Sequence, residues 1–329
     1  MNTISTATRG YEQLPIPFGW FAIAMSDEIA ATQVKEIACF GTEFVVWRSE
    51  SGVLSAFDPY CPHLGSHLGL GTVVGENLQC AFHHWAFNRE GGVSGIPYSD
   101  LVPPKLKRAC IRTWPLEERN GVVFVWYHPR GAAPKWDVVV APEVETDGWV
   151  AAGRHEWTIN IHIQEITENS TDSAHFRSVH GTQGPPDTEF KLEGWSRRNV
   201  VETEMPTPRG PMLGKIDVSA VGPGQSFTRF TDVTDVLLVQ QTTPVDSETT
   251  CIRWQFYHPP ELSEGKMRVT AARLRDLLKQ LEQDIPIWQR KRFLPDPQLV
   301  KGDGPIRSYR QQYARFYDFE SPDQPVTAE

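Results

Sequence analysis

The 329-residue chain lacks the long apolar runs and the basic clusters that mark two large classes of protein. No apolar run approaches the roughly 18 residues that a membrane-spanning helix needs. Lys and Arg number 32 against 41 Asp and Glu, a formal net charge of −9, and no basic block offers a surface for nucleic acid. We therefore expect no membrane span and no nucleic-acid partner.

Cysteine is scarce as well. The five cysteines are Cys39, Cys61, Cys80, Cys110 and Cys251. Their number is odd and their spacing is not that of a disulfide framework, which favours a reducing cytoplasmic location. The N-terminus also lacks the apolar core of a secretory signal. Unpaired cytosolic cysteines are usually core residues, and this is the role that we predict for Cys39, Cys110 and Cys251.

Short β-prone runs separated by Gly, Pro, Asp and Asn fill the first part of the chain. They are Trp20–Ala24, Glu43–Trp47, Val53–Phe57, Ala109–Thr113 and Val122–Tyr127. They predict a small all-β domain over residues 17–130, preceded by a flexible tail over residues 1–16. The Pro- and Gly-containing segment 129–134 is typical of a boundary, so we predict a second domain over 131–329.

The second domain mixes β-prone runs with two predicted helices. The runs are Asn199–Glu204, Ser226–Asp232, Val236–Thr242 and Thr250–Tyr257. One helix is predicted over 165–180, ending before Gly181, and a longer one over 262–292, where apolar residues recur at steps of 4 and 3. The fold class is therefore α+β. The acidic tail after Asp318 is expected to fray.

The first chemical motif is Cys61-x-His63, followed after 16 residues by Cys80-x-x-His83. This is the Rieske pattern, in which two thiolates hold one iron of a [2Fe–2S] cluster and two imidazoles hold the other. Neutral ligands raise the reduction potential, which suits a one-electron relay. The alternatives are a structural zinc site, which usually begins with a Cys-x2–4-Cys pair, or two unrelated Cys/His pairs.

Two further histidines lie close to this motif. His84 follows His83 directly, but only His83 satisfies the Cys-x-x-His spacing. His67 lies between the two halves of the motif. We predict that neither histidine binds the cluster.

The second chemical motif comprises Asn169, Asp172, His175 and His180. Residues three apart are neighbours on a helix, so Asn169 and Asp172 are candidate catalytic residues beside His175. His175 and His180 point about 140° apart on a regular helix, so both reach one metal only if the helix is distorted or ends between them. The alternative is two ordinary core or surface histidines.

Two histidines and one carboxylate form the facial triad of non-haem ferrous oxygenases. We predict Asp284 as the carboxylate, because it shares an otherwise apolar helix face with Leu277, Leu281 and Trp288. A carboxylate on a buried face is costly unless it is paired or metal-bound. The alternative is a surface aspartate. Pro286, two residues later, is expected to kink the helix near the ligand.

With both motifs in this order, the chain resembles the α subunit of Rieske non-haem iron oxygenases over nearly its whole length. Within that family it is similar to the oxygenase component of 3-ketosteroid 9α-hydroxylase and to cholesterol 7-desaturases. The residues that carry the resemblance are Tyr60–His63, Val122–Trp126, Asp172–Phe176, Gln283–Trp288, Asp303–Pro305 and Arg315–Tyr317.

The resemblance implies an N-terminal Rieske domain and a helix-grip-like catalytic domain with an antiparallel sheet. It implies His175, His180 and Asp284 as ligands of mononuclear Fe(II), and O2 as a co-substrate. It also implies a homotrimer, in which Asp172 bridges His175 to the cluster histidine, matching His83, of a neighbouring subunit. Because no flavin or nicotinamide motif is present, we expect electrons from NAD(P)H through a separate reductase or ferredoxin.

The implied activity is monooxygenation of an apolar polycyclic substrate, with a steroid favoured. Leu281, Trp288 and Phe176 are candidate pocket residues, with Phe190 a further one, and the region 181–241 is expected to help form the pocket. Aromatic dihydroxylation, O- or N-demethylation and desaturation are alternatives on the same machinery. Alternatives of other classes are a Rieske electron carrier without oxygenase activity and a zinc hydrolase using His175 and His180.

Overall fold

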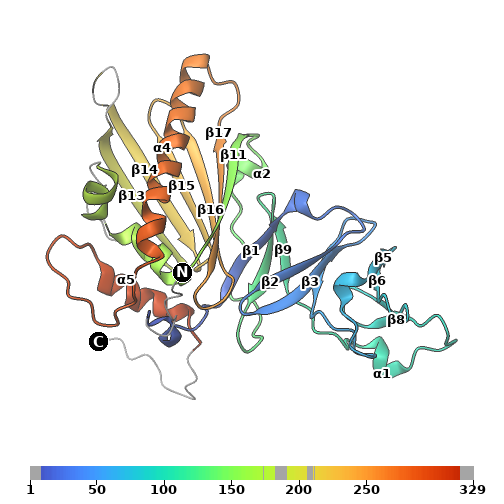
Figure 1. Ribbon diagram of the computed structural model, residues 1–329. Coiled ribbons are helices and arrows are strands. Elements are labelled where there is room, and N and C mark those ends of the chain that lie inside the picture. Colours follow the sequence, from blue (N-terminus) through green and yellow to red (C-terminus); the bar gives the residue numbers. More distant parts are fainter. Residues whose placement is uncertain (1–8, 173, 182–190, 206–209, 211, 319–329) are drawn as a thin grey trace.

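The structure, a computed structural model, describes residues 9–172, 174–181, 191–205, 210 and 212–318. It confirms the predicted fold class, a domain of small β-sheets followed by an α+β domain with one large antiparallel sheet (Figure 1). Among the helices in these ranges, none is long and apolar enough to cross a membrane. Phe190 and the tail beyond Asp318 lie outside the described residues.

The N-terminal domain contains three small antiparallel sheets. The first contains β1 (Gly19–Met25), β10 (Val122–Tyr127) and β9 (Leu116–Arg119), the second β2 (Val34–Cys39), β3 (Thr42–Arg48) and β4 (Leu54–Phe57), and the third β5 (Thr72–Val74), β6 (Asn77–Gln79), β7 (Ala86–Phe87) and β8 (Val93–Gly95). The short helix α1 (Pro104–Lys107) follows β8. The apolar run of β10 is buried along almost its whole length, which explains why it forms a central strand.

One predicted strand does not form. Over residues 109–113 the backbone N–H groups of Cys110 and Ile111 both donate to the carbonyl of Gly91, and only an isolated bridge joins Thr113 to Phe57. The β-prone side chains there pack against the core without a ladder of strand hydrogen bonds. Cys39 and Cys251 are buried and Cys110 is half-buried, all three as free thiols, in agreement with the predicted core role.

The second domain is built on a seven-stranded antiparallel sheet in the order β11-β17-β16-β15-β14-β13-β12. The strands are β11 (Val150–Ile159), β12 (Lys191–Glu193), β13 (Ser196–Met205), β14 (Met212–Val221), β15 (Gln225–Thr231), β16 (Val236–Pro244) and β17 (Thr250–His258). The helices are α2 (Pro142–Glu145), α3 (Ile163–Glu168), α4 (Glu264–Trp288) and α5 (Ile306–Tyr313). Four of these strands match predicted runs, whereas β11, β12 and β14 were not predicted.

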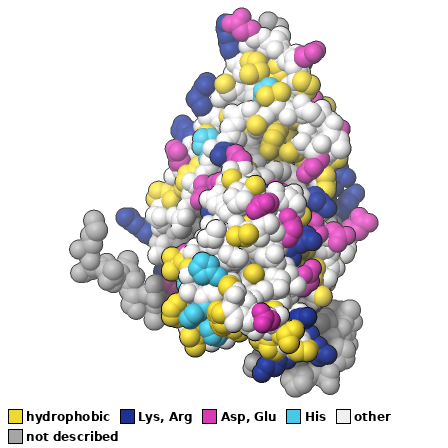
Figure 2. Space-filling model, turned by 90° about the vertical axis from the view of Figure 1, so that its right-hand side faces the viewer, with side chains coloured by type: hydrophobic (Ala, Val, Ile, Leu, Met, Phe, Trp, Pro, Cys, Tyr) yellow, Lys and Arg dark blue, Asp and Glu magenta, His cyan; other side chains and the backbone are white. Residues whose placement is uncertain are grey.

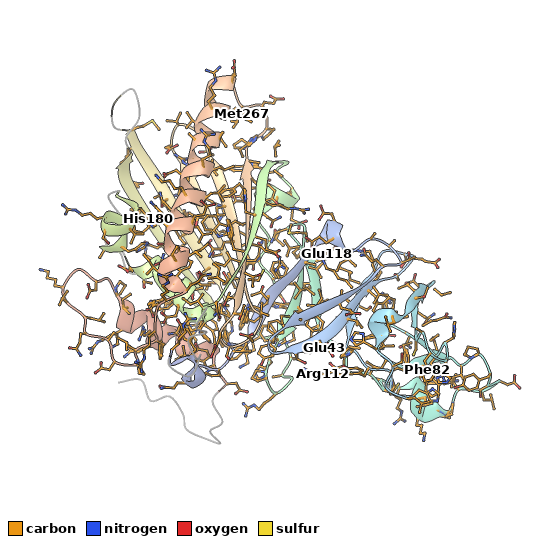
Figure 3. All side chains as sticks on the ribbon, viewed as in Figure 1. Glu43, Phe82, Arg112, Glu118, His180 and Met267 are labelled. Carbon is orange, nitrogen blue, oxygen red and sulfur yellow. The ribbon has the colours of Figure 1, made fainter. Side chains whose placement is uncertain are left out.

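The long helix α4 lies along one face of the sheet (Figure 1). Leu274, Leu281 and Trp288 are buried in the core that α4 shares with the sheet. Toward the start of α4, Met267 is 42% exposed at the outer end of the helix (Figure 3), so the predicted apolar stripe is buried only in its C-terminal part. The helix continues through Pro286 and ends at Trp288, within the turn that the proline opens.

The N-terminal tail differs from the prediction of a flexible segment over residues 1–16. From Arg9 onward the chain packs on the second domain, where the Arg9 guanidinium donates to the carbonyls of Asn160 (2.8 Å) and Trp288 (3.0 Å). Tyr11 is fully buried in the same core. An aromatic ring and a guanidinium that find buried partners therefore hold this segment in place.

The two domains meet through β1. The carbonyl of Ala22 accepts hydrogen bonds from Thr243 Oγ1 (2.6 Å) and from Arg253 Nη1 (3.0 Å). The backbone N–H of Phe40 donates to the carbonyl of Pro244 at 3.0 Å. The boundary predicted between residues 130 and 131 falls in the irregular segment that follows β10. Backbone acceptors on both sides thus fix how one domain sits on the other.

Candidate metal centres

The first half of the Cys/His motif is a tight loop that joins β4 to β5. The backbone N–H of Gly65 donates to the carbonyl of Cys61 at 2.9 Å, and the N–H of Cys61 donates to the carbonyl of Ser66 at 2.9 Å. Gly65 has a φ of 75°, a left-handed conformation that glycine adopts without strain. These bonds curl the loop around the Cys61 thiol.

The second half repeats this pattern between β6 and β7. The N–H of His84 donates to the carbonyl of Cys80 at 3.0 Å, and the N–H of Cys80 donates to the carbonyl of Trp85 at 3.0 Å. His84 is therefore the counterpart of Gly65, with a φ of 56° and an exposed side chain. His84 therefore contributes to the loop through the conformation of its backbone, as the residue at the left-handed position of the turn.

The two loops bring the four motif residues together. Cys61 and Cys80 are each 2% exposed, whereas the rings of His63 and His83 are half-buried, with centroids 4.7 Å apart. Trp85 stacks on His63 at 4.4 Å, which orients the ring. Two thiols at the inner side and two imidazoles at the outer side are the donor set of a Rieske cluster.

Burial, together with the neighbouring Cys80 thiol, raises the pKa of the Cys61 thiol to about 11. Metal ions bind the thiolate form, so cluster assembly at this site must displace thiol protons. The buried cysteine pair therefore suits a cationic cluster better than a free thiolate.

The second motif lies on two helical segments that are separated at Asp172, whose backbone is extended (φ −92°, ψ 98°), so the helix predicted over 165–180 is interrupted. After α3, a 3-10 helix covers Asn169–Thr171 and a π-helix covers Phe176–His180, ended by Gly181 in a left-handed conformation (φ 68°). In a π-helix the bonds run from i to i+5, so residues five apart return to nearly one side. The predicted distortion between His175 and His180 is confirmed, as is the helix end at Gly181.

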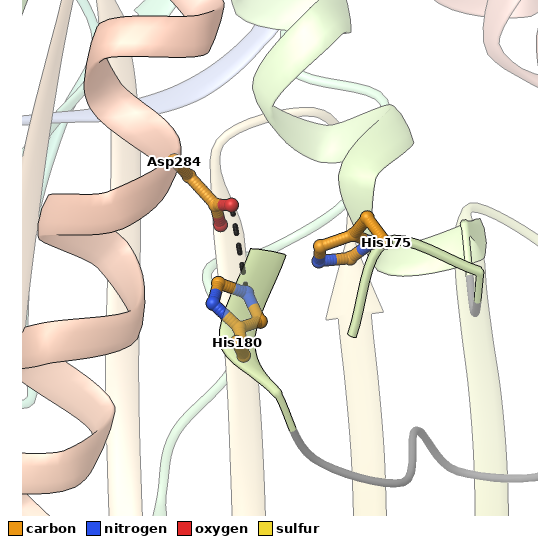
Figure 4. A group of neighbouring side chains, drawn as sticks. All are labelled: His175, His180 and Asp284. Atoms are coloured by element: carbon orange, nitrogen blue, oxygen red, sulfur yellow. Dashed lines mark ion pairs between the residues drawn. The ribbon is translucent and has the colours of Figure 1, made fainter. Parts of the chain in front are cut away.

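His175, His180 and Asp284 point toward one another, with Asp284 reaching across from α4 (Figure 4). One ligand atom of each lies within 4.8 Å of the others. Asp284 Oδ1 is 3.5 Å from His180 Nε2, and the side chains of His180 and Asp284 are 2% and 8% exposed. Two imidazoles and one carboxylate in this arrangement are the donor set of a facial triad.

Each histidine ring is held through its other nitrogen. His175 Nδ1 donates to the backbone carbonyl of Asp172 at 2.5 Å, and the Asp172 carboxylate lies 3.7 Å from the same atom. His180 Nδ1 donates to the side-chain oxygen of Gln283 at 3.1 Å. Both bonds leave Nε2 facing the shared space, as metal-binding histidines require. This role of Gln283 as the partner of His180 was not predicted, although Gln283 directly precedes Asp284 in the sequence.

The Asn169 amide lies between two of the triad residues. Its Nδ2 is 3.3 Å from His175 Nε2 and 3.2 Å from Asp284 Oδ2. The amide N–H groups thus satisfy lone pairs of the kind that a metal ion would take. Asn169 is placed to orient both ligands.

The electrostatics of the site also favour a cation. Burial raises the pKa of the Asp284 carboxyl, and His180, His175 and Asn169 oppose this effect. Burial alone would lower the pKa of His175, but its hydrogen bond to Asp172 and the charges of Asp284 and Asp172 raise it. A buried carboxylate of this kind is stabilised by a metal ion in direct contact.

A cavity of about 980 Å³ lies beside the triad, between the sheet and α4. Its apolar wall is formed by strand residues including Val201, Ile216, Val218, Phe230 and Leu238. Phe176, whose ring centroid is 4.5 Å from that of His175, connects this wall to the triad. As expected, much of the lining comes from the region 181–241, so far as that region is described.

Of the three pocket residues predicted from the sequence, one lines the cavity and two lie in the hydrophobic core. Phe176 lines the cavity. Leu281 and Trp288 are 4% and 5% exposed in the hydrophobic core and do not line it. The reason lies in the position along α4, because Leu277, two turns before Asp284 on the same face, borders the cavity with Gln280, whereas Leu281 and Trp288 lie in the core.

Comparison with known families divides the chain into two parts. The Rieske [2Fe–2S] domain family matches residues 19–112, and the family described as 3-Ketosteroid 9alpha-hydroxylase C-terminal domain matches residues 125–317. The N-terminal match contains both cluster loops. The C-terminal match contains the triad and the cavity.

Curated relatives match along most of the chain. A cholesterol 7-desaturase from Xenopus laevis is 32% identical over 93% of this chain and 73% of its own length. A probable 3-ketosteroid-9-alpha-monooxygenase, oxygenase component, from Rhodococcus rhodochrous is 31% identical over 91% of this chain and 79% of its own.

A solved structure shows the same fold at lower identity. Pseudomonas putida CBB5 NdmA with caffeine is 19% identical and superposes with a TM-score of 0.73 over 89% of this chain and 88% of that one. The chain is therefore a Rieske-type oxygenase, and it belongs to the family of the 3-ketosteroid 9α-hydroxylase oxygenase component and the cholesterol 7-desaturases.

Proposed function

We propose that this chain is the terminal oxygenase component of a multicomponent Rieske monooxygenase that hydroxylates an apolar polycyclic substrate, with a steroid as the favoured class. The observation that carries the proposal is the triad of His175, His180 and Asp284 beside a cavity of about 980 Å³, in a chain that also has a Rieske domain. The cavity is at the upper end of the roughly 300–1,000 Å³ range of small-molecule sites.

Cys61, His63, Cys80 and His83 are the proposed cluster ligands, and the triad residues are the proposed ligands of mononuclear Fe(II). Ferrous iron held by two histidines and one carboxylate leaves positions open for reaction with O2. The chain itself orients the ligands through Asp172, Gln283 and Asn169. The apolar cavity wall next to Phe176 holds a hydrophobic substrate and excludes water from the reacting carbon.

The route of electrons favours assembly with further copies of the chain. Phe82, next to His83, and His180 lie at opposite ends of one chain (Figure 3). The Asp172 carboxylate beside His175 has a side-chain exposure of 36%, so a neighbouring subunit can contact it. We therefore propose a head-to-tail homotrimer in which Asp172 links His175 to the cluster histidine His83 of the next subunit.

The surface around the cluster supports this assembly. Histidine side chains lie among hydrophobic ones low on the face shown in Figure 2. The exposed hydrophobic residues near the motif are Tyr60, Leu64, Leu70, Phe82, Tyr98 and Leu101. Apolar surface of this kind marks an interaction site. The external donor is proposed to be a cytoplasmic ferredoxin or ferredoxin-type reductase supplied by NAD(P)H.

Steroid is the proposed substrate class because relatives matching over most of the chain are named for 3-ketosteroid 9α-monooxygenation and cholesterol 7-desaturation. Both names describe oxidation of a sterol-like skeleton. Desaturation is the second candidate outcome, since the desaturases match this chain as well as the monooxygenase does. Aromatic dihydroxylation and demethylation are distinguished from both by the product.

The test combines metal content with product analysis. Wild-type protein is expected to contain about three irons and two acid-labile sulfides per chain, and Asp284→Ala about two irons. With a surrogate reductase, a 3-ketosteroid and ¹⁸O2, one labelled oxygen in the product supports hydroxylation, and an unlabelled alkene supports desaturation. If the wild type still contains two irons per chain after reloading with ferrous iron, the electron-carrier alternative is favoured. If the protein contains zinc and catalyses a hydrolysis that needs no O2, the zinc-hydrolase alternative is favoured.

A further inference from the structure

The charges that line the cavity are unusual for a protein with a formal net charge of −9. Among the lining residues that the structure describes, Arg197, Arg273 and Arg315 are cationic and Asp276 is the one acid. Asp276 is exposed and accepts a hydrogen bond from Gln280 at 2.8 Å. A cavity for a purely hydrocarbon ligand does not need an excess of positive charge.

The cavity arginines differ in their partners. Arg273 is paired with the Asp232 carboxylate, whose side chain is 3% exposed, and also donates to the carbonyl of Thr234 at 3.2 Å. Arg197 donates to Ser170 Oγ at 3.3 Å, and its guanidinium lies 5.0 Å from the centroid of the Tyr309 ring. The charge of Arg273 is thus neutralised within the protein.

Arg315, in the 3-10 helix Ala314–Phe316 that follows α5, has a different environment. Its guanidinium donates to the backbone carbonyl of Gly194, and its buried Nε has no hydrogen-bond partner within the described ranges. Burial lowers the pKa of Arg315, and no carboxylate of the described residues opposes this effect. Among the residues that the structure describes, this half-buried cation therefore has no carboxylate partner.

Two aromatic rings hold the Arg315 guanidinium in position. Its Cζ lies 5.0 Å from the ring centroid of Trp195 and 5.2 Å from that of Phe316, and these two rings also line the cavity. Contact with aromatic rings restrains a guanidinium while leaving N–H groups at its edge that can bind a carboxylate. The rings themselves would contact the apolar part of the same ligand.

We propose that Arg315 forms an anion subsite within the cavity, and that the preferred substrate is a steroid-like molecule bearing a carboxylate on its side chain. This inference rests on the proposed function, because it names the substrate class of the same cavity. The carboxylate binds at Arg315, between Trp195 and Phe316, and the polycyclic body lies along the apolar wall toward Phe176. The subsite would then fix which carbon of the substrate faces the triad.

The test measures binding without turnover. Iron-loaded protein, with no electron donor, is titrated calorimetrically with 3-oxochol-4-en-24-oic acid and with its methyl ester, which removes the charge and keeps the skeleton. Charge-assisted hydrogen bonds of this type correspond to a roughly 10- to 100-fold preference for the acid. Arg315→Gln is expected to bring the ratio of the two affinities close to one, and Arg315→Lys to an intermediate value.

Arg275→Gln is the matched control, because Arg275 is exposed on α4 and does not line the cavity. It is expected to keep the wild-type ratio. Equal cluster absorbance and iron content in all variants show that each is folded. The subsite is overturned if the wild type binds the acid and the ester with equal affinity, or if Arg315→Gln keeps the preference for the acid. The proposed steroid oxidation still stands in either case if the ester binds and is oxidised. If neither steroid binds, the proposed substrate class and the subsite fail together.

Discussion

The two candidate metal centres of this chain are built in different ways. The cluster loops are local, since residues 61–66 and 80–85 each close through two backbone hydrogen bonds around one cysteine. The triad is assembled over distance, since 103 residues separate His180 from the Gln283 side chain that orients it. A local loop can form wherever its turn residues allow, whereas the triad exists only once α4 has packed on the sheet.

The largest expected effect would separate the two centres completely. Cys80→Ser is expected to lose the cluster and all turnover while the mononuclear site still takes up one ferrous iron, because the two sites share no ligand. Asp284→Ala is expected to give the reverse, with a full Rieske absorbance spectrum and no mononuclear iron. Iron and sulfide analysis with visible absorbance checks both. Loss of both centres in either variant would mean that they fold as one unit.

Asp172→Asn tests the link between the centres. We expect a roughly 10- to 100-fold slower oxidation of the pre-reduced cluster in single-turnover experiments with substrate and O2, because the negative charge beside His175 is lost. Iron and sulfide content are expected to stay at the wild-type level. Glu264→Gln, at the exposed start of α4 and away from the cavity lining, is a matched removal of one carboxylate for the same assay. A wild-type rate in Asp172→Asn would place the electron route elsewhere.

Gln283→Leu tests how the triad is positioned. The substitution removes the acceptor for His180 Nδ1 and keeps a side chain of similar size, so the ring loses its preferred orientation. Partners of this kind typically change metal affinity by roughly 10-fold or more. Competition with a ferrous chelator measures the loss, and Glu282→Gln, on the exposed face one residue earlier, is the control. Unchanged affinity would show that packing alone orients the ring.

The smallest expected effect concerns the cluster loops. His84→Gly relieves a left-handed conformation and is expected to raise the midpoint of thermal unfolding by roughly 2 °C, equivalent to about 1 kcal/mol, with the cluster retained. Gly65→Ala is the reciprocal change, because a Cβ there meets open space and only the positive φ opposes it, so a similar decrease is expected. Loss of the cluster in His84→Gly would instead make His84 a functional residue.

Much of this organisation could be predicted from the sequence, for identifiable reasons. The cluster motif has a fixed local spacing, and the five-residue interval between His175 and His180 required a distorted helix, which the π-helix supplies. Asp284 could be selected because a carboxylate interrupts an apolar helix face. Each of these features depends on residues that lie close together in the sequence.

Features that depend on packing between distant elements could not be predicted in this way. Leu281 and Trp288 share a helix face with Asp284, but the sequence does not indicate that this part of the face meets the core, whereas Leu277 on the same face borders the cavity. Gln283 gains its importance only through a partner on another element. The packed segment from Arg9 to Leu14 similarly depends on acceptors contributed by residues far along the chain.

The placement of Phe82 and His180 at opposite ends of the molecule has a consequence for the proposed trimer (Figure 3). An isolated chain could hold a full complement of iron and sulfide and yet be inactive, since its own cluster would serve another copy's oxidation site. Specific activity would then fall on dilution as trimers dissociate, without any loss of metal. Conversely, mixing one variant that lacks the cluster with another that lacks the mononuclear iron would restore turnover by complementation between subunits.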